Sequence, residues 1–231
     1  IIALVVTMLN RAPDSALLDT LVTASTSGKS LAEVADMIAA TAEFTAENSA
    51  SQTAKEYATA ALDRAFQGAT VTADLRTAAI DLAVTYLNDG MTKAGLASVI
   101  NDFLALPTTL ANADFGNIAA AYANKNTVAE YYVLDADLGD QTVAELAAAI
   151  ASVTDDAASV TTATAAADTT ASTVTAEPGK TLTLTAGVDA VTGGAGNDTI
   201  NGVVQANGLT GSTTSPGDVV TGGAGTDTLS I

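Results

Sequence analysis

Apolar residues recur every three or four positions through the first two thirds of the chain, which is the spacing of one face of an α-helix. Between 92 and 106, for example, Leu96, Ile100 and Phe103 fall on one side. The same periodicity predicts helices at 1–10, from Pro13 to a turn at 25–29, from Ser30 to about Phe44, and at 53–66, 74–88, 92–106, 111–123, 127–134, 142–153 and from 155 onward.

Local signals fix several of the expected helix ends. Ser30 with Glu33 and Thr142 with Glu145 each form a capping box, in which the two side chains satisfy free backbone N–H groups at a helix start. Gly90 is expected to end one helix, and Pro107 to stop the next.

The pattern changes near the end of the helical part. Residues 161–175 are almost all Ala and Thr, with too few large apolar groups to bury, so this stretch is interpreted as a linker or a helix end. Residues 180–185 then alternate in polarity as a strand does. We therefore divide the chain into a helical domain at 1–165, an Ala/Thr-rich linker at 166–178 and a β region at 179–231.

Two near-identical runs stand in the β region, GGAGNDTI at 193–200 and GGAGTDTL at 222–229. Both fit the nonapeptide G-G-x-G-x-D-x-U-x, in which U is a large apolar residue. Closely spaced glycines allow tight turns through positive φ. Such turns aim carbonyl oxygens inward, and with the Asp carboxylate they offer the oxygen ligands that Ca²⁺ prefers. The predicted metal residues are Asp189, Gly193, Gly194, Gly196, Asp198, Asp218, Gly222, Gly223, Gly225 and Asp227.

The spacing of the acids supports this interpretation. Asp189 and Asp218 stand nine residues before Asp198 and Asp227, and the two pairs are 29 residues apart. Repeats of this kind return to the same edge every 18 residues, so we expect about eleven extra residues within 201–216 to loop out and leave the register intact. Asp189 and Asp218 lack the preceding double glycine, which weakens their claim to a metal. A metal-free stack of Gly/Asp turns remains the alternative.

These repeats resemble the RTX (hemolysin-type) calcium-binding repeats of proteins exported by type I secretion. The resemblance covers about 181–231. It implies a Ca²⁺-bound β-roll, so the expected fold class is multidomain, with an all-α N-terminal domain followed by an all-β, parallel β-helix-like RTX β-roll.

Charge and composition exclude several functions. The formal net charge of −18 argues against binding nucleic acid or acidic membranes. The chain has neither Cys nor His, which removes thiolate and histidine chemistry, and no nucleophile motif is present, so we expect no enzyme. The apolar run 1–9 is too short to span a bilayer, and we expect neither a transmembrane segment nor a signal peptide. The ends suggest a part of a longer protein.

A surface that binds glycans is a further hypothesis. Aromatic faces stack on sugars and amides bond hydroxyls, so Tyr131 and Tyr132 with Lys125 and Asn126 are candidates, and Arg11 is a candidate for an anionic glycan. Adjacent tyrosines more often place one ring in the core, and scattered cations more often belong to an ordinary surface.

The segment 5–44, with its Asn-Arg-Ala-Pro-Asp run at 10–14 and closing Ala-Glu-Phe, resembles a small helical domain frequent at the front of RTX surface proteins. Together with the repeats, it is similar to calcium-dependent S-layer proteins of Gram-negative bacteria. That resemblance implies a structural cell-surface protein whose helical domain anchors to lipopolysaccharide O-polysaccharide and whose repeats bind Ca²⁺, fold and self-assemble. A secreted adhesin or biofilm-matrix filament is the alternative, and a non-catalytic part of a type I-secreted enzyme is the second.

Overall fold

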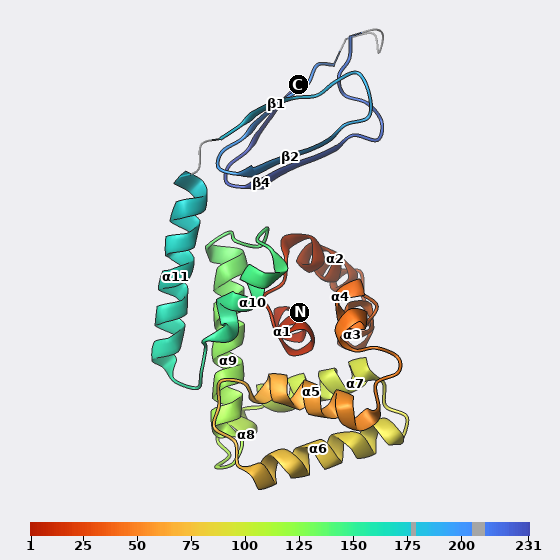
Figure 1. Ribbon diagram of the computed structural model, residues 1–231, viewed down its shortest axis with the longest axis vertical. Helices are drawn as coiled ribbons and strands as arrows, with labels where there is room; N and C mark the ends of the chain where they lie inside the picture. The colour runs from red at the N-terminus through yellow and green to blue at the C-terminus, as the bar shows by residue number, and fades with distance from the viewer. Residues whose placement is uncertain (177–178, 205–210) are drawn as a thin grey trace.

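The computed structural model describes residues 1–176, 179–204 and 211–231, and its first part is helical throughout (Figure 1). Short loops connect the helices. They are α1 (Ile2–Leu9), α2 (Ser15–Thr26), α3 (Leu31–Ala39), α4 (Ala42–Glu47), α5 (Ala54–Phe66), α6 (Ala73–Asn88), α7 (Lys93–Ala105), α8 (Pro107–Leu110), α9 (Gly116–Glu130), the π-helix η1 (Tyr131–Asp135), α10 (Val143–Ala151) and α11 (Ala157–Ala176).

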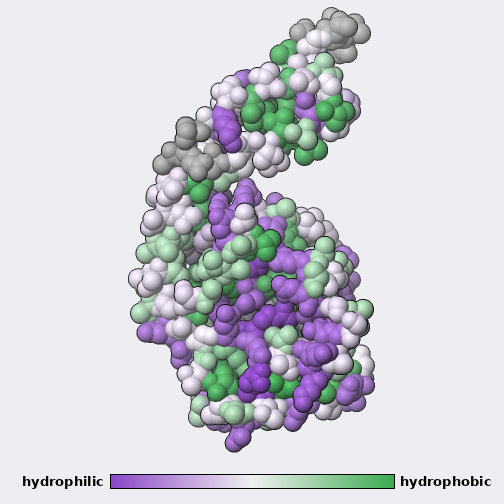
Figure 2. Space-filling view, in the orientation of Figure 1, coloured by the Kyte–Doolittle hydropathy of each residue, from purple (hydrophilic) through white to green (hydrophobic). Residues whose placement is uncertain are grey.

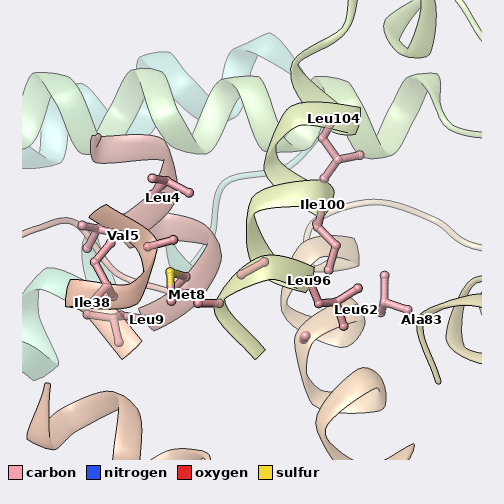
Figure 3. Close-up of a cluster of buried hydrophobic side chains, with 14 of the residues drawn as sticks. Leu4, Val5, Met8, Leu9, Ile38, Leu62, Ala83, Leu96, Ile100 and Leu104 are labelled. Carbon is pink, nitrogen blue, oxygen red and sulfur yellow. The ribbon is translucent and has the colours of Figure 1, made fainter. Parts of the chain in front are cut away.

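The first helix is the centre of the helical part. α1 is apolar on all sides, and a helix of that kind is stable only when other elements surround it. It contacts α3, α5, α7 and α9. Figure 3 shows Leu4, Val5 and Met8 of α1 in one cluster with Ile38 of α3 and Ile100 of α7. Each fully buried side chain of this size contributes about 1.5–3 kcal/mol.

A second apolar cluster lies on the other side of α1. Val6 packs there with Tyr132 of η1 and Leu146 and Ile150 of α10, and Ala167 of α11 closes it. α1 therefore joins two cores, because neighbouring residues Val5 and Val6 belong to different clusters.

The predicted helix starts are confirmed at both capping boxes. Ser30 accepts from Glu33 N while Glu33 accepts from Ser30 N, and Thr142 and Glu145 do the same. A third box at Thr53 and Glu56, present in the sequence but not recognised there, starts α5. The start expected at Pro13 is displaced, since Asp14 is the N-cap of α2.

Two helical predictions need correction. The helices expected at 111–123 and 127–134 form one continuous element, α9 running into η1, because the polar residues at 124–127 lie within the helix without ending it. The Ala/Thr-rich stretch expected as a linker or helix end is helical as far as Ala176. Several of its threonines, Thr164 among them, satisfy their hydroxyls on the carbonyl four residues earlier. Glu177 and Pro178 lie outside the described residues.

The predicted fold class, with an all-β RTX β-roll at the C-terminal end, is wrong. The chain is 58% helix and 9% strand, the strands form two small parallel sheets, and no all-β domain is present in the described residues. The strands are β1 (Thr181–Thr183), β2 (Ala190–Ala195), β3 (Thr199–Asn201), β4 (Val219–Ala224) and β5 (Thr228–Ser230), ordered β1-β3-β5 and β2-β4. Two repeat pairs supply too few strands, of three to six residues each, for a β domain. Residues 205–210 of the expected looped-out insert lie outside the described residues.

The helical part exposes one apolar groove. Leu82 and Tyr86 of α6 were expected to point inward, but they are 55% and 40% exposed. With Val99 and Phe103 of α7 they line a groove of about 330 Å³ between α5, α6 and α7. Hydrophobic patches also interrupt a largely hydrophilic face of the helical part in Figure 2. None of the helices in the described segments combines the length and apolar character needed to cross a bilayer.

Candidate cation site in the glycine-rich turns

The strands stack in layers with a fixed offset. β1 pairs with β3 at an offset of 18 residues, and β3 pairs with β5 at 29, so Leu182, Ile200 and Leu229 share one register. β2 pairs with β4 at the same offset of 29, which places Gly194 beside Gly223. The predicted alignment of the two repeat pairs is therefore confirmed.

Aspartates link successive layers. Asp198 Oδ1 accepts a hydrogen bond of 2.5 Å from the backbone N of Lys180, and Asp227 Oδ1 accepts one of 2.7 Å from the backbone N of Asp198. At the other end of β2, Asp218 Oδ1 accepts from Asp189 N at 2.9 Å. Each carboxylate thus holds the N–H of the equivalent residue one layer earlier.

Asp198 carries the most unusual group of the region. Its side chain is 1% exposed, and its Oδ2 is buried with no hydrogen-bond donor. Burying a carboxylate oxygen without a partner is costly, and such groups normally find a donor or a metal. This oxygen is therefore the strongest indication of a bound cation in the described part of the chain.

The glycines explain what lies next to that oxygen. A Cβ added to Gly193 would overlap both Asp198 Oδ2 and the carbonyl oxygen of Gly222. A Cβ on Gly222 would overlap Asp227 Oδ2 in the same way. Carboxylate and carbonyl oxygens converge where the missing side chain would stand, which gives the oxygen-only surroundings that suit a hard cation such as Ca²⁺.

The remaining glycines let the two turns approach each other closely. Gly223 and Gly225 have φ of +100° and +121°, and a Cβ on either would overlap the carbonyl of Gly194 or Gly196 in the layer before. Gly194 and Gly196 also have positive φ, as a tight turn requires. The double glycines therefore serve the contact between layers as well as the turn.

The cation site has few carboxylates. Across residues 1–176, 179–204 and 211–231, no group of three acidic side chains is placed to hold a metal ion. A cation between the turns would depend on Asp198 and Asp227 together with backbone carbonyls such as Gly222 O, a ligand type that accords with Ca²⁺.

Asp189 and Asp218 differ from the other two aspartates. The Asp189 oxygens accept from the backbone N and the Oγ1 of Thr185, at 2.7 and 2.9 Å. Asp218 Oδ2 accepts from Ser215 N at 2.6 Å, and the backbone N–H groups of Ser215 and Asp189 lower the pKa of Asp218. Both carboxylates cap turns, so the structure favours only the Asp198 and Asp227 edge as a metal site.

Lys180 is a residue of this region that the sequence analysis passed over. Its Nζ donates a hydrogen bond to the carbonyl oxygen of Gly193. The signal was available, because Lys-Thr-Leu-Thr at 180–183 aligns in register with Asp-Thr-Ile-Asn at 198–201.

The structure does not gather the candidate glycan residues on an accessible surface. Arg11 is 2% exposed and donates to Glu43 at 2.6 and 2.7 Å and to Asp14 at 3.0 Å. Burial lowers the pKa of Arg11, but hydrogen bonding and charge from Glu43, and then Asp14, raise it overall. Arg11 is a structural cation that ties the start of α2 to α4.

The other four candidates lie on α9 and η1 and are buried to different degrees. Tyr132 packs in the second core, and Lys125 is buried, with its Nζ 3.2 Å from Gln67 Oε1. Asn126 is half-buried. Tyr131 is also half-buried, and its hydroxyl donates to Asp168 at 2.5 Å. The expectation of one core and one edge tyrosine is confirmed.

Comparison of the chain with models of protein families, with curated proteins and with solved structures finds no match.

The Gly193→Ala substitution tests the close approach at the cation site. Gly193 does not have positive φ, so the added Cβ acts only through its overlap with Asp198 Oδ2 and Gly222 O. We expect a cost of about 1–3 kcal/mol and amide hydrogen exchange of Thr228, which donates to Asp198 O, about tenfold faster or more. Gly187→Ala is the matched control, because its Cβ would meet only Thr185 Oγ1 at 3.6 Å. Equal exchange in the two variants would contradict this account.

Lys125→Met should stabilise the helical part. Burial lowers the pKa of Lys125 to about 8, so at pH 7 the folded state holds a buried ammonium beside a neutral amide. Replacing it should raise the free energy of unfolding by about 1–3 kcal/mol. The gain should shrink as pH rises from about 8 towards 10.5, because the wild-type lysine then loses its proton more easily in the folded state than in the unfolded state. Urea unfolding at pH 7 and pH 10 measures both effects, and Lys55→Met, on an exposed site, should change little.

Proposed function

We propose that this chain is part of a calcium-dependent structural protein of the bacterial cell surface, of the S-layer kind that its RTX-like repeats resemble. The observation that carries the proposal is the buried Oδ2 of Asp198, which has no donor and lies beside a backbone carbonyl at a glycine. The role is structural, and the proposed site is one of binding.

Calcium would act on folding. Without a cation, the carboxylates of Asp198 and Asp227 and the carbonyls around them place negative charge and lone pairs close together. Extracellular calcium modules bind at about 10⁻⁴–10⁻³ M, so the turns would be loosely ordered in a calcium-poor cytoplasm and ordered outside the cell. This fits export by type I secretion and self-assembly at the surface.

The helical part is proposed to anchor the protein through lipopolysaccharide O-polysaccharide. The sites first considered for this role are narrowed by burial, because Arg11, Lys125 and Tyr132 are enclosed. Tyr131, with one face partly exposed at the junction of η1 and α11, is the aromatic candidate that remains. An adhesin or matrix filament would use the same calcium site and differ in what the helical part binds.

The calcium proposal is tested with Asp198→Asn combined with Asp227→Asn. The amides keep the size of the side chains and can still accept the hydrogen bonds from Lys180 and Asp198, but they remove both negative charges. We expect the calcium-induced gain of β circular dichroism to need at least about tenfold more Ca²⁺. Asp81→Asn with Asp89→Asn removes the same charge from exposed positions on and just after α6. A calcium response of the first double variant equal to that of this control would refute the site.

The anchoring proposal is tested by binding the chain, in millimolar calcium, to cells of its own species with and without surface polysaccharide. Binding that depends on the polysaccharide supports the anchor. Tyr131→Ala should then weaken binding, whereas Tyr86→Ala, which removes a partly exposed ring from the groove on α6, should not. Binding that ignores the polysaccharide would point to the adhesin or filament.

A further inference from the structure

Lys180 stands in the aspartate position of the first layer. Its backbone N–H donates to Asp198 Oδ1, just as the backbone N–H of Asp198 donates to Asp227 Oδ1. Its carbonyl accepts from Thr199 N at 2.8 Å, as the carbonyl of Asp198 accepts from Thr228 N at 2.8 Å. Three successive layers therefore carry Lys180, Asp198 and Asp227 at one equivalent place, and the first of them has the opposite charge.

The lysine is alone in its charge. It is the only basic residue after Lys125, in a stretch with thirteen of the 26 acidic residues. In a region so acidic, a single cation at the register position of an aspartate is a specific feature of the sequence.

The side chain reaches the oxygen that corresponds to the cation site one layer later. Lys180 Nζ donates to Gly193 O, and a Cβ added to Gly194 would lie 2.6 Å from this ammonium. The offsets that relate Lys180 to Asp198 and Gly193 to Gly222 are those of the layers. Gly193 O therefore faces an ammonium, whereas its counterpart Gly222 O faces the donor-free Oδ2 of Asp198.

We propose that the ammonium of Lys180 takes the place of a divalent cation in the first layer, so that the turns bind one Ca²⁺ fewer than their layers would otherwise hold. The proposal rests on the proposed function, in which the gap between Asp198 and Gly222 O takes Ca²⁺. Where two oxygens face each other, a free ion is needed between them. Where the first of the two is replaced by an ammonium, the positive charge is already attached to the chain, and the layer is complete without metal.

The experiment counts Ca²⁺ ions bound per chain at saturation, by native mass spectrometry and by equilibrium dialysis. Lys180→Asp restores the aspartate pattern to the first layer and releases Gly193 O, and we expect it to bind one Ca²⁺ more than the wild type. Lys180→Asn, which removes the charge and offers an amide oxygen, should also bind one more, at a higher Ca²⁺ concentration. Lys180→Arg keeps a cation and should bind the wild-type number.

Lys55→Asp is the matched control. It makes the same change in net charge at an exposed position in the first turn of α5, where an acidic residue is well tolerated. It should bind the wild-type number, which separates occupation of a defined place from the effect of total charge.

The outcomes separate this inference from the proposed function. An unchanged number in Lys180→Asp and Lys180→Asn, with Ca²⁺ bound by the wild type, overturns the inference and leaves the calcium site standing. An extra ion in Lys55→Asp as well also overturns it. If wild type and every variant bind no Ca²⁺, both the proposed function and the inference fail. Calcium-induced circular dichroism of each variant shows whether its turns have folded, and Lys180→Asn serves if Lys180→Asp does not.

Discussion

A single hydrogen bond, repeated from layer to layer, organises the C-terminal part of the chain. An aspartate carboxylate accepts the N–H of the residue at the same place in the layer before, at Asp198, at Asp218 and at Asp227. This bond occupies one carboxylate oxygen and leaves the other to its surroundings. Asp218 fills its second oxygen with a backbone N–H, whereas Asp198 buries its second oxygen without a donor. The chemical difference between the two edges follows from this one choice.

The helical part has a different organising element. α1 is completely apolar, so it is stable only between two cores, and the surrounding helices are arranged to cover both of its sides. The buried Arg11 directly after it is held by Glu43 and Asp14, which ties the end of this central helix to the neighbouring turns. Burial and charge pairing thus act together at one point of the chain.

Periodicity located most helices because it reports which residues share a face. It cannot report what covers that face, which is why Leu82 and Tyr86 were expected inside and lie in an open groove. Capping boxes were visible because their two partners are close in sequence. Residue type also failed to indicate burial, as Arg11 and Lys125 show, since a long charged side chain can be enclosed once it finds a partner or lowers its pKa.

The candidate site divides in the same way. The offset of 29 residues was readable from the spacing of Asp198 and Asp227, and the strand pairing follows it. The carbonyl ligands were not readable, because every residue has a carbonyl and only the fold selects Gly222 O. The resemblance that suggested a β-roll went further than five short strands can support. Lys180 was missed because a lysine does not look like an aspartate until the layers are aligned.

The order of the strands has a consequence for how samples of this protein behave. β5 is the outer strand of the three-stranded sheet and β4 belongs to a sheet of two, so within the described residues each presents hydrogen-bonding backbone along one unpaired side. Apolar side chains stand exposed there, Val219 at 61% and Leu229 at 52%. Edges of this kind accept further strands. Concentrated solutions should therefore contain species joined by strand addition, and the fraction of such species should depend on protein concentration.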